Sequence, residues 1–206
     1  MIDYFQLLQE PRRPWLDPEA LRQKFLEISS SVHPDRTHNA PEGEKTSAND
    51  RYIELNAAYQ TLRAPKERLL HLLTLELGSK PKEVQTLQAG AMDLFLQVAG
   101  QCRETDLFLA ERERASSPLL KVTFFQKAQD WTEKLQALAG QISTAQQSLE
   151  DELRSMNRFW EDAPPVGSRE RVESLPLARL EEIYRSFSYI NKWSAQLQER
   201  VVQLSF

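Results

Sequence analysis

The chain has 206 residues, of which 40% are hydrophobic and 27% are charged, and its formal net charge is -4. This composition is typical of a soluble globular protein of one or two domains, long enough to bury a core without disulfides. The acidic balance argues against nucleic-acid binding, which needs an excess of Lys and Arg on one face.

The N-terminal sequence "MIDYFQLL" has neither the basic and apolar pattern of a signal peptide nor an Arg-rich transit segment. No apolar run is long enough to span a bilayer, since even "LLHLLTLEL" is short and carries His71 and Glu76. We therefore expect a cytoplasmic protein without a membrane partner, and we expect His71 to lie at the edge of a core.

Two helices are predicted near the N-terminus. Asp3 can cap a short helix that runs to Leu8. Asp17 followed by Pro18 is a strong start signal for a longer helix, because Pro is well suited to the first helical position. This helix should end near Val32, because the residue before a proline is disfavoured in helical geometry.

A polar stretch with Pro41 and Gly43 follows, and we expect it to form an exposed loop that can continue into the next helix. That helix covers "NDRYIELNAAYQTLRAP". Pro65 either ends it or starts the next helix, and Gly78 is a suitable C-cap. Two amphipathic helices joined by a polar loop should pack as an antiparallel hairpin. The loop begins with the tripeptide His33-Pro34-Asp35.

The second half of the chain has helical periodicity throughout. A helix is expected in "VQTLQAGAMDLFLQVAGQCRETDLFLAERERA", although Gly90 and Gly100 weaken it. The lone cysteine, Cys102, excludes a disulfide or zinc knuckle within the chain and lies in an apolar-periodic stretch, which predicts a buried structural thiol.

From Pro118 to about Trp160 an apolar stripe repeats every three or four residues, as in an antiparallel bundle or coiled coil, and Gly140 could kink or split this helix. The stripe consists of Leu119, Val122, Phe125, Ala128, Trp131, Leu135, Leu138, Ile142, Ala145, Leu149, Leu153, Met156 and Trp160. A Pro-rich connector and a last helix from Leu177 follow. No segment has strand-like alternation, so the expected fold class is all-α.

The tripeptide His33-Pro34-Asp35 has two interpretations when taken alone. It can be an ordinary helix stop, since His favours the helix dipole, Pro breaks the helix and Asp starts a turn. It can also be a contact for another protein. In that case Pro34 limits the ordering entropy lost on binding, Asp35 can pair with an Arg and His33 offers a directional polar contact.

With its flanks, the N-terminal part resembles the J-domain of DnaJ-type co-chaperones. The resemblance covers Asp3 to about Leu75 and is based on "DYFQLL", the tripeptide, the helix order and "LNAAYQTLRAP". In that family the tripeptide loop and the preceding helix bind a DnaK-type chaperone and stimulate its ATP hydrolysis. The residues that this implies for chaperone binding are His33, Pro34, Asp35, Arg22, Lys24 and Arg36. Glu27 and the serines that follow leave this surface only weakly basic, which suggests a specialised partner or a transient contact.

The chain has neither the Gly/Phe-rich linker nor the four-Cys-motif zinc module of general J-proteins. It is similar instead to the HscB family, J-type co-chaperones of iron–sulfur cluster assembly, in "LRQKFLEISSSVHPDR", "LNAAYQTLRAPKERLLHLLTLELG" and "RSFSYINKW". The resemblance implies a J-domain hairpin over residues 1–78 and a C-terminal antiparallel helical domain that binds a client or scaffold over residues 84–206. It implies two partners, a DnaK- or HscA-type chaperone and an IscU-like iron–sulfur scaffold protein.

The family's client-binding surface is apolar and acidic. The positions that match it here are Leu94, Phe95, Leu96 and Tyr189. The chain departs from the family at Gln97 and Gly100, where acids are expected. Bundle core is the competing interpretation of the apolar triplet 94–96, but three consecutive residues cannot all face one side of a helix, so at least one should be exposed or packed against the J-domain.

We expect no enzymatic activity, since there is no Gly-rich phosphate loop and the adjacent acids Glu181 and Glu182 point apart on a helix. His33, Asp35 and His38 lack a fourth ligand, so we expect neither a metal nor a cofactor. Two other functions stay open: a J-domain protein with another client, and a helical adaptor whose J-domain is degenerate. The sequence does not specify the oligomeric state or the chaperone paralogue.

Overall fold

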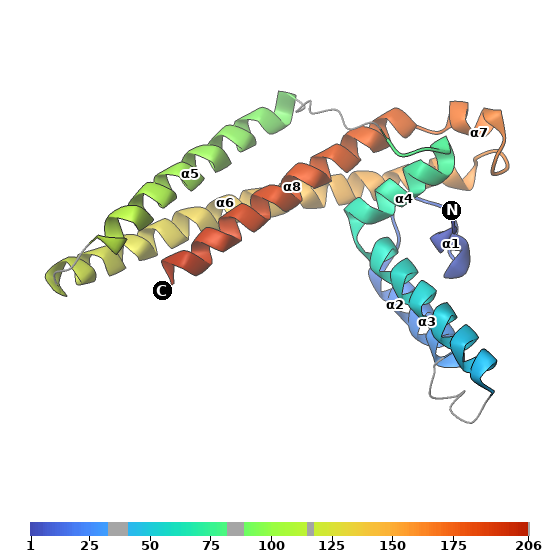
Figure 1. Ribbon diagram of the computed structural model, residues 1–206. Coiled ribbons are helices and arrows are strands. Elements are labelled where there is room, and N and C mark those ends of the chain that lie inside the picture. The colour runs from blue at the N-terminus through green and yellow to red at the C-terminus, as the bar shows by residue number, and fades with distance from the viewer. Residues whose placement is uncertain (33–40, 82–88, 115–117, 206) are drawn as a thin grey trace. The chain divides into compact units, whose positions relative to one another are not determined.

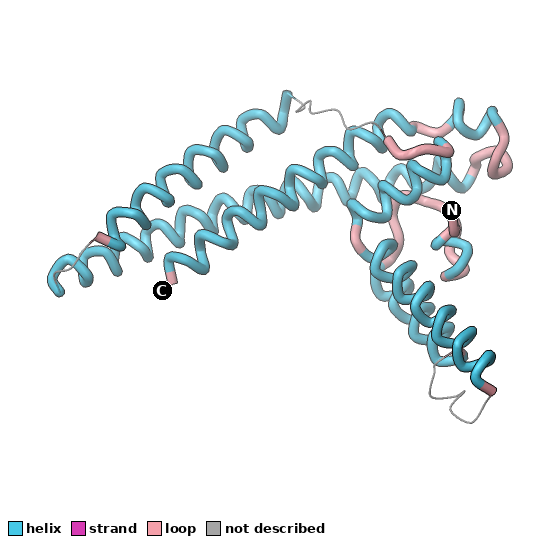
Figure 2. Tube along the Cα trace, viewed as in Figure 1, coloured by secondary structure: helices cyan, strands magenta, loops and turns pink. Residues whose placement is uncertain are grey.

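The computed structural model describes residues 1–32, 41–81, 89–114 and 118–205. Within these ranges the chain forms eight α-helices and no strand (Figures 1 and 2), which confirms the all-α fold class. In the same ranges, no helix is both long and apolar enough to cross a membrane. The loop with His33, Pro34, Asp35, Arg36 and His38 lies outside the described residues.

The described residues pack as two compact units. The first consists of Met1–Glu83 and Glu150–Tyr184, and the second of Val84–Leu149 and Arg185–Phe206. The segment 150–184 thus packs with the N-terminal part, whereas the boundaries expected from the sequence place it in the C-terminal domain. Those boundaries, 1–78 and 84–206, stay a prediction.

The first unit begins with α1 (Tyr4–Leu7), α2 (Pro18–Ser31), α3 (Glu42–Arg63) and α4 (Pro65–Leu77). The predicted start signals work as expected. The Asp3 carboxylate accepts hydrogen bonds from the backbone N–H groups of Phe5 and Gln6 in α1, and that of Asp17 accepts from Ala20 N at 2.8 Å in α2. At the other end, α2 stops with Val32 as its C-cap.

Helices α2 and α3 form the predicted antiparallel hairpin, side by side in Figure 1. Between them the rings of Phe25 and Tyr59 stack with their centroids 4.4 Å apart. Helix α3 also packs against α1 and α4. It starts at Glu42, so most of the polar stretch before Tyr52 is helix rather than loop.

Three further segments complete the first unit: the end of α6 (Pro118–Glu161), the short α7 (Arg169–Ser174) and the start of α8 (Leu177–Leu204). A buried ion pair holds α7 in place. Arg171 donates two hydrogen bonds to the Glu76 carboxylate, at 2.8 and 2.9 Å, and Trp160 Nε1 donates a third at 3.3 Å. Helix α7 was not predicted, because it lies in the stretch expected to be a connector.

The second unit is a bundle of α5 (Ala89–Glu113), the first part of α6 and the last part of α8. Helices α5 and α8 run in the same direction, because Phe95 lies against Trp193 near one end and Arg112 donates to the carbonyl of Gln203 at the other. Helix α6 runs antiparallel to α5, since the ring of Phe108 packs against Phe124 near the start of α6.

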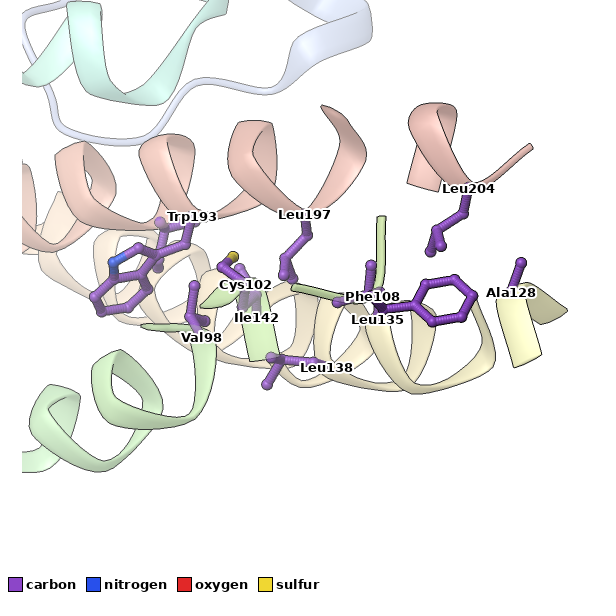
Figure 3. Packing of buried hydrophobic residues seen from close by; sticks show 11 residues of the cluster. Val98, Cys102, Phe108, Ala128, Leu135, Leu138, Ile142, Trp193, Leu197 and Leu204 are labelled. Carbon is purple, nitrogen blue, oxygen red and sulfur yellow. The ribbon is translucent and has the colours of Figure 1, made fainter. Parts of the chain in front are cut away.

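The core of the second unit draws on all three helices (Figure 3). Cys102 is buried within it, as predicted for a structural thiol, and burial raises the pKa of this thiol. The core residues are Val98, Cys102, Phe108, Ala128, Leu135, Leu138, Ile142, Ile190, Trp193, Leu197 and Leu204.

Two details of the long helix differ from the sequence prediction. Gly140 does not split α6, which continues as one helix from Pro118 to Glu161. Val122 and Phe125 are 60% and 72% exposed, although the apolar stripe included them. Phe124 packs toward the core in their place, because its ring meets Phe108 of α5 with centroids 5.7 Å apart.

Candidate functional site

The tip of the α2–α3 hairpin is the first candidate site. Helix α2 ends at Ser31 and α3 begins at Glu42, so the predicted chaperone-binding tripeptide falls between two helices that pack together. The tripeptide itself lies outside the described residues. What the structure describes is its support, the paired helices on both sides.

The two basic residues predicted on α2 both have acidic neighbours. Arg22 is exposed and lies 3.4 Å from Glu19 in the preceding turn. Lys24 Nζ lies 2.7 Å from the buried carboxylate of Glu10 and donates to the carbonyl of Gln9 at 2.9 Å. An exposed pair such as that of Arg22 binds weakly and leaves the guanidinium accessible. Lys24, in contrast, compensates a buried charge and is held within the first unit.

His71 positions the first helix. Its Nε2 accepts a hydrogen bond from the backbone N–H of Tyr4 at 3.1 Å, and its ring stacks on that of Tyr4 with centroids 4.5 Å apart. The residue is buried, and this burial lowers the pKa of His71. The neutral form is the one that can accept from Tyr4, so the desolvation and the hydrogen bond favour the same state.

Arg68 is a buried cation that links the hairpin to the loop before α2. Its Nε donates to the carbonyl of Pro14 at 2.8 Å and its Nη1 to that of Leu62 at 2.7 Å. Burial lowers the pKa of Arg68 to about 10. Sequence reasoning noted Arg68 only as part of a segment that matches the family. Nothing near Arg68 in the sequence indicates that its side chain donates to the carbonyl of Pro14, 54 residues earlier.

The candidate client site lies in the second unit, at the start of α5. Leu94 is partly buried against the core, whereas Phe95 is 37% and Leu96 is 58% exposed. The expectation that the triplet cannot be wholly buried is therefore confirmed. Met92, 42% exposed, lies on the same side of the helix because residues three or four apart are neighbours. We call Met92, Phe95 and Leu96 the α5 apolar patch.

Trp193 connects the patch to Tyr189. Its ring lies 6.4 Å from that of Phe95 and 5.9 Å from that of Tyr189, centroid to centroid. The structure thus brings Phe95 and Tyr189, far apart in sequence, to one tryptophan. Sequence reasoning missed Trp193 as a support of this site, because it lies at helical spacing from other apolar residues of the last helix, such as Ile190 and Leu197, and that spacing indicates only core.

Metal binding was not expected from the sequence. Within the described residues, no three His, Cys, Asp or Glu side chains lie together in a way that could hold an ion. His33, Asp35 and His38, which the sequence suggested as the nearest thing to a ligand set, are outside those residues.

Known structures show the same fold. The chain is similar to the chaperone HscB from Vibrio cholerae, with 19% sequence identity, a TM-score of 0.64 and coverage of 98% of this chain and 99% of that one. It is also similar to the human co-chaperone protein HscB, with 20% identity, a TM-score of 0.60 and coverage of 96% and 81%. No protein-family model matches the sequence. The chain therefore has the HscB fold over nearly its whole length.

Proposed function

We propose, from the premise of the HscB fold, that this chain is a co-chaperone. In this role it stimulates ATP hydrolysis by a DnaK- or HscA-type chaperone through His33, Pro34 and Asp35. It then delivers a client, for which an IscU-like iron–sulfur scaffold protein is the first candidate. The observation that carries the proposal is the combination of full-length likeness to HscB with a His-Pro-Asp tripeptide between two antiparallel helices.

The physical argument concerns the loop and its support. A loop between two packed helices presents its side chains from a rigid base, and a proline within it reduces the conformational entropy lost on binding. Asp35 can form a charge-assisted pair with an arginine of the chaperone, and His33 can supply a directional hydrogen bond. The accessible guanidinium of Arg22 adds steering toward an acidic partner.

The test is a steady-state ATPase assay with a DnaK-type chaperone. We expect wild-type protein to stimulate hydrolysis and His33→Gln to abolish the stimulation, because the contact is lost while the helices that support it remain. His38→Gln, in the same loop, is the matched control and should stimulate as wild type does. A folded His33→Gln variant with full stimulation would refute the proposal.

The second part of the proposal places client binding at the α5 apolar patch together with Leu94 and Tyr189. Exposed apolar residues beside a partly exposed tyrosine form a surface that gains free energy when a partner covers it. The patch has no carboxylates at positions 97 and 100, where Gln and Gly stand. The contact should therefore depend on apolar burial more than on charge.

Titration calorimetry with a purified scaffold protein tests this second part. We expect Leu96→Ala to weaken binding by about tenfold, since burying a leucine side chain contributes about 1.5–3 kcal/mol. Leu107→Ala is the matched control: Leu107 is 59% exposed on the same helix but lies outside the patch. Equal loss in both variants would remove the α5 apolar patch from the proposal. No scaffold binding by wild type at high micromolar concentration would remove the scaffold.

One observation favours an alternative, a helical adaptor with a degenerate J-domain. The two cations predicted for α2 both lie beside acids, and Lys24 is bound to a buried carboxylate. An adaptor of this kind would bind the client but leave the chaperone's ATPase rate unchanged. The two assays above separate it from the co-chaperone, and from a J-domain protein with a different client.

A further inference from the structure

The last turns of α6, in the first unit, carry two exposed arginines that lie on aromatic rings. The guanidinium carbon of Arg154 lies 4.2 Å from the ring centroid of Trp15, and that of Arg158 lies 4.9 Å from that of Phe159. Across the part of the chain that the structure describes, no carboxylate is within ion-pair distance of either arginine. The two positions are four residues apart, so both side chains project from one side of the helix.

The platform beneath Arg154 is fixed by a buried asparagine. Asn157 is 8% exposed; its Oδ1 accepts from the backbone N–H of Trp15 at 3.0 Å, and its Nδ2 donates to the Trp15 carbonyl at 3.0 Å. This two-point contact joins the loop before α2 to α6. A guanidinium that lies on the ring of a tryptophan with an anchored backbone has fewer conformations to lose when it binds.

We propose that Arg154 and Arg158 form a binding site for an acidic segment of a protein partner. Each guanidinium can donate two parallel hydrogen bonds to one carboxylate, and neighbouring acidic side chains can reach two arginines one helical turn apart. Neither residue belongs to the chaperone-binding or client-binding sets above. The surface is therefore a third contact, independent of the proposed function.

The local charge favours short acidic peptides over nucleic acid. Glu161 and Asp162 are exposed directly after the arginines, and the chain carries a net charge of -4. A continuous phosphate backbone would bring further negative charge against these carboxylates. A peptide with a few glutamates places its charges only at the two guanidinium groups.

Fluorescence anisotropy with the full chain tests the site, with a short fluorescein-labelled peptide that carries two neighbouring glutamates among neutral residues as the probe. We expect R154Q/R158Q to bind the peptide about tenfold more weakly than wild type, as follows from the loss of charge-assisted hydrogen bonds. R103Q/R114Q removes the same charge from exposed arginines of the second unit and should bind as wild type does. R154K/R158K keeps the charge but loses the planar fork, so it should fall between wild type and R154Q/R158Q.

Three results would overturn the inference. Equal weakening in both glutamine double variants would show that only net charge matters. Undiminished binding by R154Q/R158Q would show that the arginines take no part. Tighter binding of a single-stranded oligonucleotide than of the two-glutamate peptide, lost in R154Q/R158Q, would assign the site to phosphate instead.

Discussion

Protonation of the His71 side chain would have a clear structural consequence. Its Nε2 is the acceptor for the first backbone N–H of α1, and the ring lies between Tyr4 and Phe5, with centroids 4.5 and 5.9 Å away. Protonation would convert the acceptor into a donor facing another donor. The nearby charges, Asp3 and Arg12, act in opposite directions on the His71 pKa, and desolvation is the larger effect.

This geometry predicts a pH-dependent loss of stability. Because the pKa of His71 is lowered in the folded state, its contribution is complete above the unfolded pKa of about 6.5 and is lost as pH falls through the lower folded pKa. His71→Gln keeps an acceptor but does not titrate. We expect urea denaturation to show that wild type loses more stability than His71→Gln between neutral pH and pH 5. Parallel pH profiles for the two proteins would contradict this.

At the scale of single residues, the sequence predicts local roles better than long-range ones. Asp3 and Asp17 cap helices as expected, since both cap signals lie within four residues of their targets. Lys24 was expected on a free basic surface, but its partner Glu10 comes from another segment of the chain. Trp193 likewise acquires its place beside Phe95 only when α5 and α8 pack.

Helix ends are the elements for which local chemistry decides most. Pro65 both follows the end of α3 and opens α4, and Gly78 closes α4 with a φ of 73°, in the left-handed region. Gly140, in contrast, lies inside α6, exposed, with no atom near the position that a Cβ would take. The two glycines therefore have opposite consequences for substitution.

Substitution by alanine makes this difference measurable. Gly140→Ala should stabilise the second unit by up to about 1 kcal/mol, because alanine has the higher helix propensity and nothing obstructs its methyl group. Gly78→Ala should destabilise the chain by about 1 kcal/mol, because its left-handed backbone is unfavourable for a residue with a Cβ. Thermal denaturation of both variants is the measurement, and a destabilised Gly140→Ala would indicate that α6 needs a flexible point there.

Helix α7 shows where sequence patterns stop predicting elements. It has six residues, too few for a visible period, and it lies among prolines that indicate a connector. Helix α7 is held by the buried ion pair of Arg171 with Glu76 of α4, a residue 95 positions earlier in the sequence. The prediction that Phe125 faces the core near the start of α6 was wrong for a related reason. Spacing alone allows either Phe124 or Phe125 to face inward, and it is the contact with Phe108 of α5 that places Phe124 there.

For the molecule as a whole, the proposed chaperone and the proposed client correspond to different units. The hairpin on either side of the proposed chaperone-binding tripeptide belongs to the first unit, and the α5 apolar patch belongs to the second. Each unit has its own buried residues: Leu69 is fully buried in the first, and Leu135 is fully buried in the second. Because α6 and α8 contribute residues to both units, cooperativity between them is a question for experiment.

A pair of core substitutions answers that question. Leu135→Ala should destabilise by about 2–5 kcal/mol, as a large-to-small change does in a packed core, and should weaken scaffold binding while ATPase stimulation persists. Leu69 is equally buried, and Leu69→Ala should weaken ATPase stimulation while scaffold binding persists. Both assays are run with each variant at one temperature, chosen so that wild type is fully folded. If either variant lost both activities together, the two units would unfold as one cooperative block, because the helices they share would transmit the lesion.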